Sequence, residues 1–108
     1  MTKIIIYKSK NQYSGFTCQG HAGYADYSKD IVCASISILV INTINSIEMY
    51  TEDLCEVKTD EKTGFIQCLF PNSISSDGEL LMNAMILGLT EIKKQYGKTY
   101  IDLKFEEV

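Results

Sequence analysis

The first twenty residues show the alternation of apolar and polar positions that is typical of β-strands. Residues 4–8 alternate in this way, and residues 14–19 do so again with Phe16 and Cys18 on one parity. The polar stretch Lys10-Asn11-Gln12 separates the two runs. We therefore predict two short strands joined as a hairpin, followed over residues 20–29 by a loop of small and turn-forming residues.

A long apolar run, from Ile31 to about Met49, predicts the first helix. Asp30 is placed to cap it, because a carboxylate accepts hydrogen bonds from the free amides of a first helical turn. We take one set of positions at helical spacing as the buried stripe: Ile31, Ala34, Ile38, Ile41 and Ile44. A second set widens it: Val32, Ile36, Leu39, Val40 and Ile47. We expect the other helix or the second subunit of a homodimer to cover the extra apolar surface.

The second half of the chain predicts another hairpin, another helix and a last strand. Residues 54–60 and 64–70 are β-rich, and Ser76 with Glu79 matches a capping box at the start of the second helix. The buried stripe of that helix is predicted at Leu81, Met85, Leu89, Ile92 and Tyr96. Alternation over residues 100–106 predicts the last strand. The order ββαββαβ favours an α+β two-layer sandwich, with two helices on one face of a mostly antiparallel five-stranded sheet.

The composition is that of a single globular domain over residues 1–108. Apolar residues make up 45% of the chain, which is enough for a core and excludes intrinsic disorder. A net charge of −4 argues against direct nucleic-acid binding and favours a basic partner. The first apolar run is too short for a secretion signal, and polar residues interrupt the uncharged stretch 31–47. We therefore expect a cytoplasmic protein without a membrane partner.

A histidine and a cysteine are the main candidates for chemistry. His21 lies in the predicted loop, twelve positions before Cys33. With Asp30 as the cap, Cys33 falls in the first helical turn, where free amides and the helix dipole favour a thiolate and can hold an oxyanion. A nearby histidine can accept the thiol proton and later protonate a leaving amine, as in cysteine hydrolases.

Other interpretations of these residues stay open. Cys33 can be a small packed side chain, which would make the chain a non-enzymatic, ribosome-associated or protein-binding module. Cys18, His21 and Cys33 can supply three metal ligands, but no fourth ligand follows at matching spacing, so we assign neither a metal nor a cofactor. No C-x-x-C pair occurs, so we expect four free thiols, with Cys55 and Cys68 in the core.

The predicted loop and the start of the first helix resemble a known family. Gly20-His21-Ala22-Gly23-Tyr24-Ala25, followed by Asp30-Ile31-Val32-Cys33-Ala34, is similar to the signature of the bacterial ribosomal-processing cysteine proteases. The resemblance covers essentially the whole chain, including its length, its element order and Leu87-Gly88-Leu89. Ser28 and Ser35 depart from the pattern, because glycine and alanine are common at these positions.

This resemblance implies an activity and a set of site residues. Members of the family are cytoplasmic homodimers that remove the N-terminal extension of a large-subunit ribosomal protein, cleaving after aromatic residues. By resemblance, Cys33 is the nucleophile, His21 the general base, Asp30 an orienting residue or helix cap, and Ser37 a hydroxyl at the site. We expect an apolar cleft near the loop to hold the aromatic side chains of this basic substrate. Substrate binding is assigned to Gly20, Gly23, Tyr24 and Tyr27.

Overall fold

A computed structural model describes residues 1–20, 27–97 and 99–108, and in this part of the chain the predicted order ββαββαβ is confirmed. The elements are β1 (Thr2–Ser9), β2 (Gln12–Gln19), α1 (Tyr27–Tyr50), β3 (Glu56–Asp60), β4 (Phe65–Leu69), α2 (Ser76–Tyr96) and β5 (Ile101–Glu107). The helix α1 begins earlier than predicted, so Tyr27 belongs to the helix and not to the loop before it.

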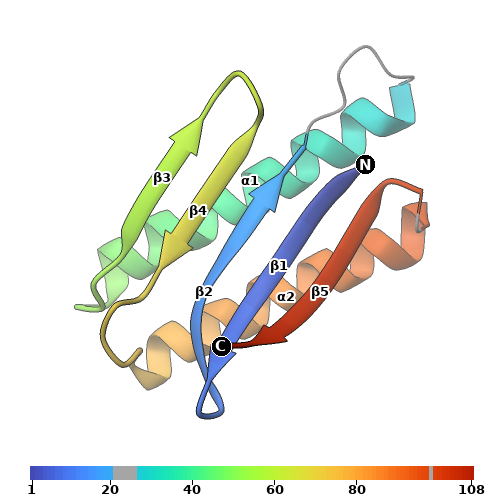
Figure 1. The fold of residues 1–108 in the computed structure, drawn as a ribbon. Helices are drawn as coiled ribbons and strands as arrows, with labels where there is room; N and C mark the ends of the chain where they lie inside the picture. Colours follow the sequence, from blue (N-terminus) through green and yellow to red (C-terminus); the bar gives the residue numbers. More distant parts are fainter. Residues whose placement is uncertain (21–26, 98) are drawn as a thin grey trace.

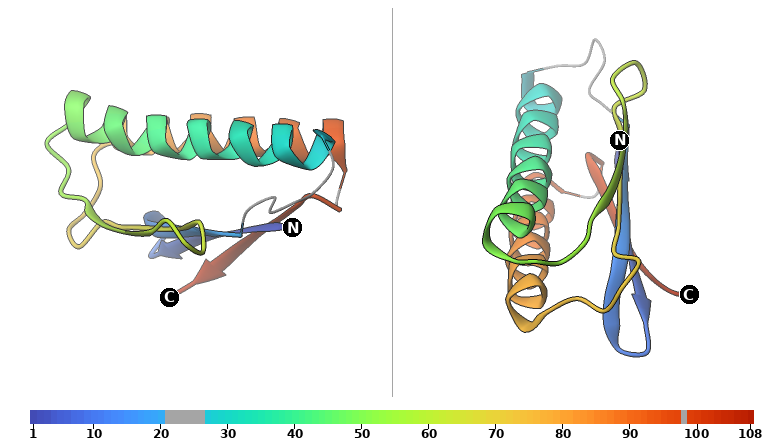
Figure 2. Two further views of the ribbon diagram at one scale, coloured as in Figure 1. Left: turned by 90° about the horizontal axis from the view of Figure 1, so that it is seen from above. Right: turned by 90° about the vertical axis from the view of Figure 1, so that its left-hand side faces the viewer.

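The five strands form one mixed sheet in the order β3-β4-β2-β1-β5. The pairs β1–β2, β2–β4 and β3–β4 are antiparallel, whereas β1 and β5 run parallel, with Thr2 opposite Ile101. Both helices lie on one face of this sheet (Figures 1 and 2). The predicted two-layer sandwich with a mostly antiparallel sheet is therefore confirmed.

The turn of the first hairpin lies where the sequence predicts it. Lys10 and Asn11 have φ angles of 53° and 66°, the left-handed conformation that a two-residue hairpin turn of type I′ requires at both central positions. The turn closes the ladder between β1 and β2 at the pair Ser9 and Gln12. Apart from a register shift between Tyr7 and Lys8, the pairing is continuous and places the buried side chains of both strands under the helices.

The helix α1 faces the sheet with the second of the two predicted sets of apolar positions. Its buried apolar side chains are Val32, Ile36, Val40, Ile44 and Ile47. The choice of the other set as the buried stripe was wrong, because Ile38 is 70% and Ile41 is 47% exposed. Both sets follow a helical period, so periodicity alone cannot tell which one contacts the sheet. Only Ile44 belongs to the predicted stripe and is buried.

The stretch 31–50 of α1 is long and apolar enough to cross a membrane, judged by length and composition. In the fold it packs on the sheet along one side, as the burial of Val32, Val40 and Ile47 shows. The structure therefore gives this helix the place in the core that the sequence analysis expected for it.

The helix α2 contacts the sheet through Met82, Met85 and Leu89, which are fully buried, while Leu81, Ile92 and Tyr96 pack partly buried against the core. The helix α2 therefore turns the predicted face toward the sheet.

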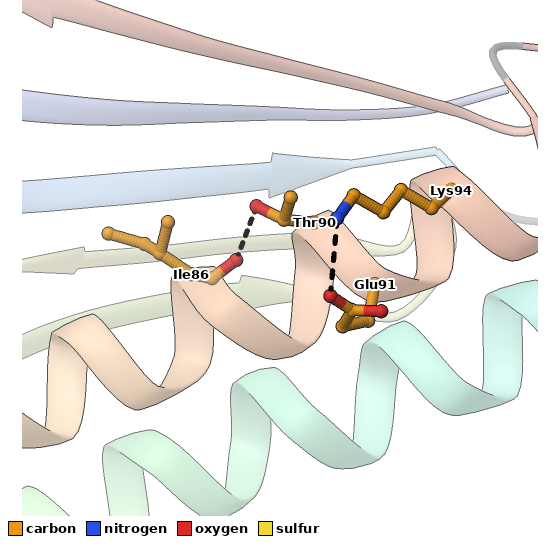
Figure 3. Close-up of polar contacts among 4 residues, drawn as sticks. All are labelled: Ile86, Thr90, Glu91 and Lys94. Atoms are coloured by element: carbon orange, nitrogen blue, oxygen red, sulfur yellow. Dashed lines mark hydrogen bonds and ion pairs between the residues drawn. The ribbon is translucent and has the colours of Figure 1, made fainter.

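Polar contacts on the same helix are shown in Figure 3. The Thr90 hydroxyl donates to the carbonyl of Ile86 at 2.8 Å, and the Lys94 ammonium lies 3.7 Å from the Glu91 carboxylate. The ion pair is exposed, so it contributes little to stability.

The start of α2 differs from the predicted capping box. Its N-cap is Ser75 and not Ser76, because the Ser75 hydroxyl accepts a hydrogen bond from the Gly78 amide at 3.1 Å. The Ser75 hydroxyl donates to Asp53 at 2.7 Å, and the Ser75 amide donates to the same carboxylate at 3.0 Å. A residue distant in sequence thus takes the place of the expected glutamate, which no local pattern reveals.

Candidate active site

Cys33 lies in the second turn of α1 and is partly exposed. The prediction that Cys33 lies in the first turn is wrong, because the helix begins at Tyr27. Only the first four amides of a helix lack an intrahelical acceptor, so the amide of Cys33 is not free to hold an oxyanion. The effect of the helix dipole also falls off beyond the first turn.

Asp30 is the fourth residue of α1 and not its N-cap. The start of α1 was predicted too late, because the apolar run begins only at Ile31. The more polar stretch Tyr27-Ser28-Lys29-Asp30 already forms the first turn of the helix. The assignment of Asp30 as a helix cap is therefore corrected, and its assignment as an orienting residue is untouched by this finding.

Beneath α1, Cys18 of β2 is the cysteine nearest to the site. Burial, with a smaller contribution from the neighbouring Cys33 thiol, raises the pKa of the Cys18 thiol to about 11. Cys18 therefore stays protonated at neutral pH, where only a thiolate is a good nucleophile. The partly exposed Cys33, and not the buried Cys18, is therefore the candidate for chemistry on this side of the sheet.

The other two cysteines form a separate contact. Cys68 is buried on β4, and its thiol shares a hydrogen bond with the partly exposed Cys55 just before β3. Burial, together with Cys55, raises the pKa of Cys68 to about 12, and burial likewise raises the pKa of Cys55. All four cysteines are free thiols, as predicted. Cys68 is in the core as expected, while Cys55 packs at its margin.

Ser37 lies one helical turn after Cys33 on the same side of α1, because residues four apart are neighbours on a helix surface. It lines a hollow between α1 and the β3–β4 hairpin, together with Ile41 and Phe65. This hollow could not be identified from the sequence. The signal that pointed to it was the excess of apolar positions on the first helix, which the other helix or a second subunit was expected to cover.

The remaining predicted site residues fall partly outside the described ranges. His21, Gly23 and Tyr24 lie outside them, and of Tyr27 only the helical backbone is described. Gly20 follows β2 with a φ of +103°, and a Cβ there would lie 2.7 Å from the carbonyl oxygen of Met1, so this close approach to β1 requires glycine. Within residues 1–20, 27–97 and 99–108, no three metal-binding side chains come together.

Comparison with known proteins gives a consistent result over nearly the whole chain. The model of the family described as "Cysteine protease Prp" matches residues 1–102. A Staphylococcus aureus relative named ribosomal processing cysteine protease Prp is 22% identical over 98 residues, which cover 91% of this chain and 92% of the relative. A Bacillus subtilis relative of the same name is 29% identical and covers 75% of this chain and 76% of its own length.

Solved structures show the same fold. The S. aureus protease in complex with a covalently linked product peptide has a TM-score of 0.87 at 22% identity, covering 98% of this chain and all of the other. The same protease with a substrate peptide has a TM-score of 0.90 at 21% identity and the same coverage. A Streptococcus mutans protein has a TM-score of 0.86 at 25% identity, covering 100% of this chain and 96% of the other.

Proposed function

Because the chain belongs to the cysteine protease Prp family, we propose that it removes the N-terminal extension of a large-subunit ribosomal protein during ribosome maturation, cleaving after aromatic residues. The observation that carries the proposal is the family match together with a partly exposed cysteine, Cys33, on the helix that follows the family-like motif. The names of the S. aureus and B. subtilis relatives support a ribosomal substrate.

In the proposed mechanism, Cys33 and His21 act as a dyad. His21 takes the proton of the Cys33 thiol, and the thiolate attacks the carbonyl carbon of the scissile peptide bond. The tetrahedral intermediate expels the amine, which receives the proton from His21, and leaves a thioester on Cys33. His21 then deprotonates a water molecule that hydrolyses the thioester and restores the thiol. None of these steps uses a metal or a cofactor.

Several residues are proposed to support this dyad. Asp30 orients His21 from the first turn of α1, and Ser37 presents its hydroxyl one turn beyond Cys33. Gly20, Gly23 and Tyr24, which lie between β2 and α1, bind substrate together with Tyr27, the first residue of α1. Support comes from the order in the sequence, because the substrate-binding residues and Asp30 all lie between Cys18 on β2 and Cys33 on α1.

The proposal extends to assembly and location. We propose a cytoplasmic homodimer, supported by large apolar side chains that stay exposed on both helices: Ile38 is 70% and Leu87 is 64% exposed. The net charge of −4 supports a basic protein substrate and argues against direct contact with nucleic acid. Sedimentation of the purified chain measures the dimer directly.

The test is a cleavage assay on the large-subunit ribosomal protein with its native extension, with product masses read by mass spectrometry. The wild-type chain should remove the extension at one bond, and Cys33→Ala and His21→Ala should each abolish cleavage. Cys55→Ala is the matched control, because this partly exposed thiol lies outside the proposed site and should leave cleavage intact. A well-folded wild-type chain that cleaves nothing and binds the protein would point to a binding module with an inert Cys33.

A further inference from the structure

Two adjoining hollows of about 250 and 310 Å³ lie between α1 and the β3–β4 hairpin. Ile41, Thr59 and Ile66 line both of them, and we call the two hollows together the groove. Phe65 adds apolar surface near the hairpin turn, and Val57 adds it near the start of β3. A groove of this size with an apolar lining can hold more than one large side chain.

One end of the groove lies next to Cys33. Ser37, which lines that end, is one turn from Cys33 on α1. Across the sheet, Ile66 of β4 is the register partner of Cys18, whose thiol neighbours that of Cys33. Two independent elements, a helix and a strand pair, therefore connect the groove to the proposed nucleophile.

The length of the groove fits a short extended peptide. Along α1 it reaches from Ser37 to Glu48, which corresponds to about 16 Å at the helical rise of 1.5 Å per residue. An extended chain advances about 3.3 Å per residue, so about five residues span this distance. Alternate side chains of such a peptide would point into the apolar lining.

The charged side chains that line the groove in the described structure are all acidic. Asp60 and Glu61 lie at the end near Ser37, and Glu48 lies at the other end. These carboxylates are exposed, so they favour a basic ligand without the cost of burying a charge. An apolar lining with an acidic rim selects a segment that carries both apolar and basic side chains.

We propose that this groove binds about five extended residues of the peptide substrate next to the scissile bond, through apolar side chains held against Ile41 and Ile66 and a basic side chain beside Glu48 or the Asp60–Glu61 pair. The inference rests on the proposed protease function, because it places the scissile bond at Cys33. It adds the place where the substrate binds and the residues that select it: Ile41 and Ile66 for the apolar side chains, and the acidic rim for the basic one.

The first experiment measures binding without turnover. In a Cys33→Ala background, a fluorescent peptide copied from the extension and cleavage site of the ribosomal protein is titrated by anisotropy. Adding Ile41→Asn should weaken binding about tenfold or more, the effect of losing one apolar contact in a pocket. Met49→Asn is the matched control, because this side chain is 75% exposed on the same helix and lies outside the groove. Equal binding by both variants would overturn the proposal.

A second pair of variants tests the acidic rim. Glu48→Lys and Glu61→Lys should weaken binding of the basic peptide several-fold but leave a matched peptide with neutral side chains in place of lysine and arginine unaffected. Glu106→Lys, an exposed change of the same charge on β5 at the far edge of the sheet, should have no such effect. If Glu106→Lys weakens binding as much, the effect is one of net charge and the rim plays no part.

The outcomes separate this inference from the protease function. If the wild-type chain cleaves the ribosomal protein and Ile41→Asn cleaves it with unchanged KM, the function stands and the groove is not the substrate site. If the wild-type chain cleaves nothing but the Cys33→Ala chain binds the peptide through Ile41, the groove stands and the function fails. If Ile41→Asn splits a dimer in sedimentation, a second copy of the chain occupies the groove, and the proposal is wrong.

Discussion

The four cysteine side chains lie in different environments, which decide how each thiol reacts. Burial raises the pKa of Cys18 to about 11 and, with Cys55 beside it, that of Cys68 to about 12. Burial also raises the pKa of Cys55. Cys33 is partly exposed on α1. Its three counterparts are therefore poor nucleophiles near neutral pH, whether or not a reagent reaches them.

Alkylation should follow this order. With iodoacetamide near neutral pH, Cys33 should be modified first, about tenfold or more faster than Cys55 and well before the buried Cys18 and Cys68. Peptide mapping by mass spectrometry at short reaction times gives the four rates. His21→Ala should slow Cys33 alone if the histidine holds the thiolate. Equal rates for Cys33 and Cys55 would contradict the special reactivity of Cys33.

At the residue scale, the sequence was enough to predict a cysteine protease, which the family match confirms. The sequence motif contains a histidine and a cysteine, which are the residue types that this class of nucleophilic catalysis uses. The cap of α1 could not be predicted in the same way, and the assignment to Asp30 was wrong, because a cap depends on where the helix begins. The stretch Tyr27-Ser28-Lys29-Asp30 contains neither glycine nor proline, so nothing stops the helix from beginning four residues before Ile31.

At the scale of the elements, all five strands and both helices were predictable, while the orientation of α1 was not. Its two apolar sets differ by a rotation about the helix axis, and the sheet selects the set with Val32, Ile36 and Val40. The cap of α2 shows the same limit, because Asp53 reaches Ser75 from the segment before β3. Long-range contacts decide both features, and a local pattern does not contain them.

A pair of neighbouring substitutions tests the orientation of α1. Ile36→Ala should lower the free energy of unfolding by about 2–5 kcal/mol, because it removes a fully buried side chain and leaves a cavity. Ile38→Ala, at a position that is 70% exposed, should change the free energy of unfolding of the monomer by less than about 0.5 kcal/mol. Urea denaturation at low protein concentration measures both. A larger loss from Ile38→Ala would mean that the other face of α1 is the buried one.

At the scale of the whole molecule, the buried thiols link the stability of the fold to alkaline pH. In the folded chain, Cys18 and Cys68 hold their protons up to a pH of about 11 and about 12, whereas an unfolded thiol releases its proton near its ordinary value of 9.0. Between these values the unfolded state binds fewer protons than the folded state. Stability is therefore fully present below pH 9.0 and falls as the pH rises toward the folded values.

Denaturation over a pH series should show this fall. The free energy of unfolding should decrease steadily above about pH 9, and Cys68→Val should flatten the decrease, because valine fills the same apolar site and cannot ionise. Cys33→Val serves as a control for a cysteine outside the core. An unchanged pH profile in Cys68→Val would show that the buried thiol does not govern the alkaline limit.

The parallel pairing of β1 with β5 also determines when the fold can be completed during synthesis. β1 is an interior strand of the sheet, and its second partner is β5, the stretch Ile101–Glu107. The pairing of Thr2 with Ile101 therefore forms only after the end of the chain has been synthesised. A contact between residues so far apart raises the contact order and slows folding. Until that stretch leaves the ribosomal exit tunnel, one side of β1 is an open edge. Such an edge is exposed to pairing with other chains. A protein of this topology therefore reaches its native state only after translation of nearly the whole domain.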